Sequence, residues 1–258
     1  MNYLRERIKK REKIYGTITS LTDPCICEIF GKTDYDYIWI DMEHTYISYK
    51  EVLCHLNAAK STNTPTIIRV PQNDLTVTKK ILEMGADGII FPMVRTAKEV
   101  DEFIKSTLYP PYGTRGFGPM RAIGYGAEDV LDYVDNKSLD YCRFVQIEHL
   151  DCISNLEEIA KNPYIDGFIF GPNDLSGSMG KLGHVFDEDV AENIDKAISI
   201  VRKNEKYVGV AVGFDEQTIK YWTKFDVDMF TVGADWNFLY TQSRTVSKRM
   251  QEILKNKD

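Results

Sequence analysis

The chain lacks the long apolar runs from which membrane-spanning helices are built. No stretch of its 258 residues approaches the roughly 20 consecutive apolar residues that a helix needs to cross a bilayer. Residues 1–13 are rich in Arg, Lys and Glu and have no apolar centre, so they do not match a secretory signal. They predict a short polar helix instead, and we expect a cytoplasmic protein.

Positive charge and cysteine are also scarce. The 32 Lys and Arg residues are outnumbered by 39 Asp and Glu, and the net charge of −7 argues against general affinity for nucleic acid. Five cysteines form no disulfide framework, which indicates reduced thiols. The Cys25-Ile26-Cys27 pair has no second Cys or His pair to complete a zinc site, so we expect the cysteines to serve packing.

The chain does contain a regular alternation of short apolar runs and helical patterns. No linker rich in Pro, Gly or Ser interrupts it, so we expect one domain over residues 1–258. Strands are predicted at residues 14–18, 37–40, 66–70, 88–91, 143–147, 167–170, 207–212 and 229–232. Eight strands alternating with helices are typical of a (β/α)₈ barrel. An open doubly wound sheet would alternate too, but it would more often carry a Gly-rich nucleotide loop after its first strand.

Several helix boundaries are marked in the sequence. Capping-box spacing predicts helix starts at Ser48, Thr96 and Ser154, each followed three residues later by Glu. After Asp74 an apolar helical pattern leads to Gly85, a plausible C-terminal stop. A further apolar stripe runs from Val190 to Val201, and residues 236–254 predict a last helix.

One long segment, residues 105–140, breaks the regular spacing. Its part from Tyr109 to Pro119 is too rich in Gly and Pro for a helix. Long ordered loops in compact enzymes often bind ligands. Because the segment follows the fourth predicted strand, we expect it to lie over the active face.

Two carboxylates stand where predicted strands end. Glu148 ends the motif Gln146-Ile147-Glu148, which follows the apolar run Arg143-Phe144-Val145. Asp174 lies in the motif Gly171-Pro172-Asn173-Asp174, which follows the next apolar run, residues 165–170. In an α/β barrel this is the end at which chemistry is done. Two hard oxygen ligands there would suit Mg²⁺ or Mn²⁺. The alternative is that both residues merely cap the helices that follow.

Two basic residues follow neighbouring strands. His44 lies just past the second strand, and an imidazole there suits general acid-base catalysis, although a solvated loop histidine is the plain alternative. Arg69 lies near the end of the third strand, inside the apolar run Thr66–Val70, and should face a carboxylate or an anionic substrate, or else form a surface salt bridge. With the two carboxylates, this set suits carbon–carbon chemistry next to a carbonyl. A Schiff-base mechanism is disfavoured because no predicted strand contains Lys.

The chain resembles the class II, metal-dependent pyruvate aldolases of the 4-hydroxy-2-oxoheptanedioate aldolase type, the HpcH/HpaI family. The likeness covers nearly the whole sequence. Its landmarks are Asp41-x-Glu43-His44, Ile68-Arg69-Val70, Gly85-Ala86 to Pro92-Met93-Val94, Tyr109-Pro110-Pro111-x-Gly113-x-Arg115-Gly116, Gln146-x-Glu148 and Gly171-Pro172-x-Asp174-Leu175-Ser176.

The resemblance implies a role for each matching residue. His44 would be the catalytic base, Glu83 would tune that base, and Arg69 would stabilise the oxyanion. Glu148 and Asp174 would bind a divalent metal, Mg²⁺ or Mn²⁺ with Co²⁺ or Zn²⁺ as alternatives. The pyruvate part of the substrate would be held by Gln146 and by the segment Gly171, Pro172, Asn173 and Asp174. The family fold is a (β/α)₈ barrel whose terminal helix packs on a neighbouring subunit, commonly in a hexamer, and residues 236–254 could serve that purpose.

The chain departs from the family pattern in three places. His149 stands where relatives usually carry a small hydroxyl residue, Thr45-Tyr46-Ile47 replaces the usual continuation after His44, and residues 117–122 look shorter. We expect all three changes to lie near the part of the site that reads the aldehyde.

The leading hypothesis is an aldolase that deprotonates a C4 hydroxyl, cleaves the C3–C4 bond of a 4-hydroxy-2-oxo acid and releases pyruvate and an aldehyde. The alternative enzyme class is a Claisen-type synthase that joins oxaloacetate to an acyl-CoA, as citrate synthases do. A barrel that only binds or regulates is a third reading. It is disfavoured because such a barrel needs no set of His44, Arg69, Glu148 and Asp174.

Overall fold

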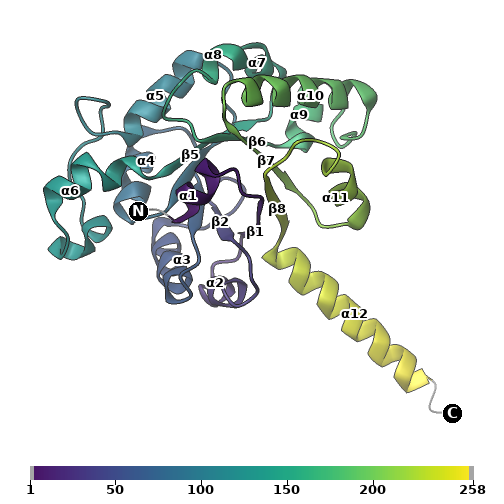
Figure 1. Ribbon diagram of the computed structural model, residues 1–258. Coiled ribbons are helices and arrows are strands. Elements are labelled where there is room, and N and C mark those ends of the chain that lie inside the picture. Colours follow the sequence, from purple (N-terminus) through teal and green to yellow (C-terminus); the bar gives the residue numbers. More distant parts are fainter. Residues whose placement is uncertain (1–2, 256–258) are drawn as a thin grey trace.

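The computed structural model describes residues 3–255, and within them eight parallel strands close into a barrel (Figure 1). Each strand pairs with the next, and β8 pairs with β1, which confirms the predicted (β/α)₈ fold. The strands are β1 (Ile14–Thr19), β2 (Tyr37–Asp41), β3 (Thr66–Arg69), β4 (Gly88–Phe91), β5 (Cys142–Ile147), β6 (Gly167–Phe170), β7 (Tyr207–Val212) and β8 (Met229–Ala234). The sequence places all eight correctly, with the largest error at the end of β8.

Helices connect the strands and cover the outside of the barrel (Figure 1). They are α1 (Tyr3–Lys9), α2 (Cys25–Phe30), α3 (Tyr49–Ser61), α4 (Leu75–Glu83), α5 (Ala97–Thr107), α6 (Val130–Asp135), α7 (Leu150–Ser154), α8 (Leu156–Ile159), α9 (Pro172–Ser178), α10 (Glu188–Lys203), α11 (Glu216–Trp222) and α12 (Asp235–Lys255), with 3₁₀ turns η1 (Arg121–Gly126) and η2 (Lys137–Leu139). In the described residues 3–255, no helix combines the length and apolar character that a membrane span requires.

Strands β2 to β6 are buried at every residue, because one face looks into the barrel and the other packs under helices. The barrel interior is filled by large apolar side chains, among them Trp39, Ile67, Ile90, Phe144, Ile169 and Met229. Leu4 and Ile8 of α1 belong to the same cluster, so α1 closes the amino end of the barrel. Within residues 3–255 the interior is therefore a packed core, closed at the amino end by α1 and open at the carboxyl end.

Helix boundaries follow the capping signals at most positions. Ser48 and Thr96 form complete capping boxes, and Asp74 caps α4, which stops before Gly85 at φ +79°. The start predicted at Ser154 is wrong: this residue ends α7, and its hydroxyl donates to the Leu150 carbonyl at 3.0 Å. A serine side chain can bond backward within a helix as well as forward at a cap, and spacing alone does not separate the two.

The segment 105–140 does not lie over the active face, contrary to expectation. It follows α5, which runs antiparallel to the strands and so ends at the amino end of the barrel. Arg121 shares a surface hollow with Thr66 and Asp87 at the amino ends of β3 and β4, and its guanidinium donates to Asn57 at 2.8 Å. The stretch from Tyr109 to Pro119 contains no helix, as its composition predicts.

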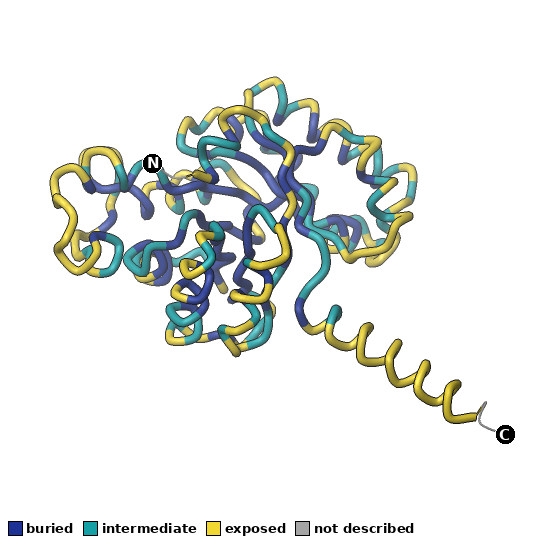
Figure 2. The backbone as a smooth tube through the Cα atoms, turned by 60° about the horizontal axis from the view of Figure 1, so that its bottom comes forward, coloured by how far each residue is buried: buried dark blue, intermediate teal, exposed yellow. Residues whose placement is uncertain are grey.

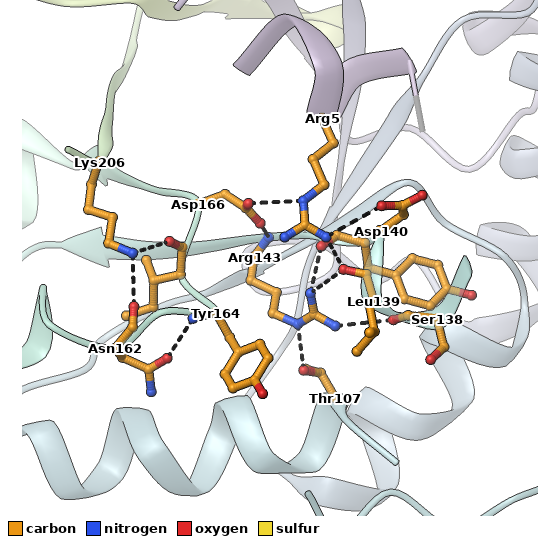
Figure 3. A network of polar contacts seen from close by, with 12 residues as sticks. Arg5, Thr107, Ser138, Leu139, Asp140, Arg143, Asn162, Tyr164, Asp166 and Lys206 are labelled. Atoms are coloured by element: carbon orange, nitrogen blue, oxygen red, sulfur yellow. Dashed lines mark hydrogen bonds and ion pairs between the residues drawn. The ribbon is translucent and has the colours of Figure 1, made fainter. Parts of the chain in front are cut away.

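A polar network ties the elements at this amino end (Figure 3). Arg143 of β5 is fully buried, and its guanidinium donates to Thr107 Oγ1 at 2.7 Å and to the Tyr141 carbonyl at 2.8 Å. Burial lowers the pKa of Arg143 to about 10, against the opposing charge of Asp166. That carboxylate also accepts from the Arg143 backbone at 2.8 Å and pairs with Arg5 at 3.2 Å. These contacts stabilise the amino end of the barrel, the end that serves stability rather than catalysis in this fold.

The last helix, α12, projects away from the barrel (Figure 1), and its surface is exposed over nearly its whole length (Figure 2). Every described residue from Leu239 to Lys255 is exposed. Six of these residues are large and apolar: Leu239, Tyr240, Val246, Met250, Ile253 and Leu254. The predicted helix over 236–254 is confirmed, and within one chain its apolar side chains have no cover.

Candidate active site

A cavity of about 800 Å³ opens at the carboxyl end of the barrel. Its walls come from the ends of β1, β2, β3, β5, β6, β7 and β8 and from the loops that follow them. Of the predicted site residues, it brings together His44, Arg69, Gln146, Glu148, Gly171, Pro172, Asn173 and Asp174. Glu83 is the one that it leaves out.

Arg69 is fixed at the floor of this cavity by two acidic residues of the β2 end. Its Nε donates to Asp41 Oδ1 at 2.9 Å and its Nη2 to Asp41 Oδ2 at 2.7 Å, while Nη1 lies 2.9 Å from Glu43 Oε2. The guanidinium also stacks over Trp39, 5.2 Å from the ring centre. Burial would lower the pKa of Arg69, but the hydrogen bonds and charge of Asp41 raise it overall. The prediction that Arg69 faces a carboxylate is confirmed, and it remains a permanent cation.

Glu148 is held from two sides at the end of β5. Its Oε1 accepts from Gln146 Nε2 at 2.9 Å, and its Oε2 accepts from the Met93 backbone at 2.9 Å. Met93 adopts a left-handed φ of +54°, unusual for a residue with a side chain, which turns its N–H toward the carboxylate. The other end of the Gln146 amide, Oε1, accepts from Arg69 Nη1 at 3.5 Å. Gln146 therefore links the Glu148 carboxylate to the Arg69 guanidinium.

Gly171 makes room for Glu148. A Cβ at position 171 would lie 2.8 Å from both Cγ and Oε1 of Glu148, closer than side chains tolerate. Asp174 follows in the first turn of α9, which begins with Pro172. Because β5 and β6 are hydrogen-bonded neighbours, the two carboxylates meet on one side of the cavity.

The acidic residues of the cavity disturb one another's protonation. Burial raises the pKa of Glu148 to about 7, and the charges of Glu43 and Asp174 add to this effect, while the Met93 N–H and Arg69 oppose it. Burial likewise raises the pKa of Glu43 to about 6, against the charge of Arg69. Crowded carboxylates of this kind are relieved when a cation binds between them.

The donor set fits a hard divalent cation. Glu148 and Asp174 offer carboxylate oxygens to the same cavity, and no third His, Cys, Asp or Glu in residues 3–255 completes a protein-only metal site with them. Mg²⁺ commonly keeps several waters and takes only one or two carboxylates from the protein, with the rest of its shell left for substrate. The pair therefore suits a metal that holds a substrate, rather than a closed structural site.

His44 lies on the rim of the cavity with an exposed side chain. Its Nε2 is 3.8 Å from Glu43 Oε2, the oxygen that also faces Arg69. Glu43 is thus the acidic side chain next to the histidine within one chain. The prediction assigns this place to Glu83, but Glu83 ends α4 at the amino end of the barrel, beside Gly118. Within one chain Glu83 cannot reach His44, because a helix that follows a strand carries its last residue back to the opposite end.

A buried carboxylate shapes one wall of the cavity. Asp235, the first residue of α12, accepts through Oδ2 from the backbone of Ser20 at 2.8 Å and of Leu21 at 2.9 Å. Its Oδ1 accepts from the Trp236 backbone at 2.8 Å. All three partners line the cavity, so Asp235 joins the loop after β1 to the start of α12. Sequence reasoning missed Asp235, Asp41 and Met93, although two of them lie within the landmark motifs.

The three departures from the family pattern fall in different places. Thr45 and Tyr46 line the cavity, as expected. His149 does not line it: its Nδ1 accepts from the Asp151 backbone at 3.0 Å and caps α7, so a ring nitrogen does what a small hydroxyl would do. Residues 117–122 belong to the segment at the amino end. Two of the three changes therefore lie outside the lining of the cavity within one chain.

This fold and this cavity define a (β/α)₈-barrel enzyme. Acidic oxygen donors, one fixed guanidinium and one histidine meet at the carboxyl ends of its strands, and none of the eight strands contains a lysine. A sequence model of the HpcH/HpaI aldolase/citrate lyase family matches residues 16–235, and the chain belongs to this family.

Individual relatives agree with that assignment. A hydroxypyruvate/pyruvate aldolase from Roseobacter denitrificans is 32% identical over 212 residues, 81% of this chain and 82% of the relative. The crystal structure of an HpcH/HpaI aldolase/citrate lyase family protein from Burkholderia cenocepacia is similar with a TM-score of 0.91 at 27% identity, covering 97% of this chain and 100% of that one. The citrate synthase SbnG is similar with a TM-score of 0.86 at 25% identity, covering 98% and 99%.

Proposed function

We propose that this protein is a divalent-metal-dependent aldolase that cleaves a 4-hydroxy-2-oxo acid to pyruvate and an aldehyde. The observation that carries the proposal is the meeting of Arg69, Glu148 and Asp174 in one cavity with His44 on its rim. The likeness to a hydroxypyruvate/pyruvate aldolase supports it. So does the absence of lysine from the eight described strands, since an aldolase without a Schiff-base lysine needs another electron sink.

Each residue has a task in this reaction. His44 removes the proton of the C4 hydroxyl, which drives cleavage of the C3–C4 bond. Arg69, held still by Asp41, offers a fixed positive charge where negative charge develops on the ketone oxygen. Gln146 and the backbone N–H groups of Asn173 and Asp174, in the open first turn of α9, orient the pyruvate part.

Glu148 and Asp174 are the residues that would hold the metal. When bound there, a cation such as Mg²⁺ or Mn²⁺ supplies Lewis-acid polarisation of the 2-oxo group. The protein's own contribution is to keep both carboxylates in place. Gln146 and the Met93 backbone do this for Glu148, and Gly171 leaves the space that it occupies.

The exposed apolar side chains of α12 support a homo-oligomer. A projecting helix with six large apolar residues open to water is costly for an isolated chain. A second copy of the chain is the occupant that the proposal names, as the terminal helix of the family would imply. Removal of residues 239–258 should lower the mass measured by light scattering to that of a monomer. The five free thiols fit a reducing compartment, so we propose the cytoplasm.

A Claisen-type synthase is the second candidate, because the solved citrate synthase SbnG is similar over nearly the whole chain. An acyl-CoA carries several phosphate charges, which proteins usually meet with Arg or Lys. Among the described residues that line the cavity, Arg69 is the one Lys or Arg, and three of its donors already face Asp41 and Glu43. This makes the cavity better suited to an aldehyde.

Cleavage of 4-hydroxy-2-oxopentanoate, which yields pyruvate and the uncharged acetaldehyde, followed by reduction of released pyruvate with lactate dehydrogenase, tests the proposal. We expect pyruvate to be released with Mn²⁺ or Mg²⁺, and we expect EDTA to stop this release. Asp195→Asn, a change on the exposed face of α10, should behave as the wild type. No release from this or a shorter 4-hydroxy-2-oxo acid, together with citrate formation from oxaloacetate and acetyl-CoA, would favour the synthase.

A further inference from the structure

We propose that the outer part of the cavity selects aldehydes whose remaining group is uncharged and apolar. The inference rests on the proposed aldolase activity and names the class of its second substrate. The juxtaposition that carries it is an aromatic rim above a floor whose one guanidinium is held by two carboxylates.

The inner and outer parts of the cavity differ in the side chains that line them. Its inner end holds the polar groups described above, which suffice for a molecule as small as pyruvate. Its rim carries three large aromatic side chains from three different loops: Tyr46 after β2, Phe214 after β7 and Trp236 after β8. Leu21 and Val212 extend the apolar surface between them. A volume of about 800 Å³ leaves ample room beyond the pyruvate for the aldehyde's own substituent.

The rim aromatics are more exposed than their size favours. Tyr46 is 83% exposed, Phe214 69% and Trp236 54%. Exposed aromatic side chains at the mouth of a polar cavity are typical of a surface that gains stability when an apolar group covers it. A substituent that lies among these rings would remove its own apolar surface and theirs from water together.

A negatively charged substituent would find no basic partner there within one chain. Arg69 donates two hydrogen bonds to Asp41, and its Nη1 lies 2.9 Å from Glu43. No other Lys or Arg among the described residues lines the cavity. His44 must be neutral to act as the base. The remaining charged residues of the lining are acidic: Asp41, Glu148, Asp174 and Asp215, and the last of these caps α11 through a 2.8 Å hydrogen bond. A carboxylate on the aldehyde would therefore be repelled and desolvated without compensation.

A matched pair of aldehydes tests this selection. 4-Methylpentanal and 4-oxobutanoate have the same chain length and nearly the same shape, and they differ in an isopropyl group against a carboxylate. We expect kcat/KM for aldol addition to pyruvate, with saturating Mn²⁺, to favour 4-methylpentanal by about tenfold or more. Equal values, or a preference for 4-oxobutanoate, would overturn the selection.

A gain-of-charge variant sharpens the test. Phe214→Arg places a cation on the rim and should move the ratio of the two kcat/KM values toward 4-oxobutanoate by about tenfold. Phe117→Arg adds the same charge to an exposed ring in the segment at the amino end, and it should leave the ratio unchanged. A folded Phe214→Arg enzyme with the wild-type ratio would contradict the role of the rim. If that variant does not fold, the wild-type ratio alone decides.

Pyruvate enolisation separates this inference from the proposed function. Exchange of deuterium into the pyruvate methyl group needs no aldehyde. Metal-dependent exchange together with a reversed aldehyde preference would overturn the selection and leave the aldolase standing. Absence of exchange with any divalent metal would overturn the aldolase, and the inference would fall with it.

Discussion

Asp41 holds Arg69 by two parallel hydrogen bonds, from Nε to Oδ1 at 2.9 Å and from Nη2 to Oδ2 at 2.7 Å. Both residues are nearly buried, at 4% and 7% exposure, and they belong to the paired strands β2 and β3. A bidentate pair fixes the plane of the guanidinium as well as its position. Arg69 is thus a rigid charge before any substrate arrives, which is what stabilisation of a developing oxyanion requires.

Arg69→Ala should lower kcat for cleavage by about 10²–10³-fold, because the fixed charge beside the ketone oxygen is lost. It should also lower the free energy of unfolding by about 3–5 kcal/mol, since Asp41 is left buried without its partner. Steady-state kinetics and urea denaturation measure the two effects. Unchanged turnover in the folded variant would remove Arg69 from the mechanism.

Asp174→Asn should weaken the binding of Mn²⁺, because an amide oxygen replaces a charged ligand in a site with only two carboxylates from the chain. Calorimetric titration of the metal-free enzyme measures this change directly. Asp195→Asn on α10 removes the same charge far from the cavity and should keep the wild-type affinity. Equal affinity in both variants would show that Asp174 is no ligand.

Gly171→Ala should reduce both metal affinity and turnover by about tenfold or more, because its Cβ would stand 2.8 Å from the Glu148 carboxylate and push it aside. The backbone at this position, with φ −104°, suits any residue, so the variant should still fold. Gly116→Ala lies in open surface, 3.7 Å from the nearest atom, and is the matched control. A Gly171→Ala enzyme with normal Mn²⁺ affinity would show that Glu148 can move without loss.

His55 should make the protein less stable in acid. It is fully buried in α3. Burial lowers its pKa below the ordinary value of 6.5, although the Leu21 backbone and the charges of Asp235 and Asp23 partly oppose this. The histidine therefore binds a proton more tightly in the unfolded chain than in the folded chain. Its contribution to the free energy of unfolding is present above pH 6.5 and is lost as the pH falls below that value.

His55→Leu should remove this dependence. Between pH 7.5 and pH 5.5 the free energy of unfolding should fall less for the variant than for the wild type, by up to roughly 1.4 kcal/mol per pH unit. His184→Leu changes an exposed histidine and should retain the wild-type slope. Parallel curves for wild type and His55→Leu would refute the assignment.

Sequence patterns predicted the barrel well because each strand is a short apolar run that stands between helix signals. The same reasoning failed where a connection had to be placed in space. The segment 105–140 follows α5, a helix that returns to the amino end, so its position after the fourth strand did not bring it to the active face. Glu83 was assigned from the family resemblance, and within one chain it ends α4 at the same amino end, outside the cavity. The direction of α4 and α5 could have shown this in advance, because a helix that follows a parallel strand runs back to the amino end of the barrel.

Other site residues were beyond sequence reasoning for a different reason. Met93 acts through a backbone N–H turned by a left-handed φ, and no side-chain pattern marks such a role. Asp235 follows β8 and reaches the loop after β1, a contact that exists only because the barrel closes. Asp41 was visible beside Glu43 and His44, but its bond to Arg69 depends on the register of β2 against β3.

Deuterium exchange into the methyl group of pyruvate, followed by proton NMR with and without Mn²⁺ and EDTA, shows directly whether the protein forms a pyruvate enolate and whether a metal is required. It measures enolate formation at the cavity without any knowledge of the aldehyde. A metal-dependent pyruvate aldolase should give exchange that requires the metal, that EDTA abolishes and that is slowed in Arg69→Ala. Exchange that ignores EDTA, or no exchange with any divalent metal, would contradict a metal-dependent pyruvate aldolase.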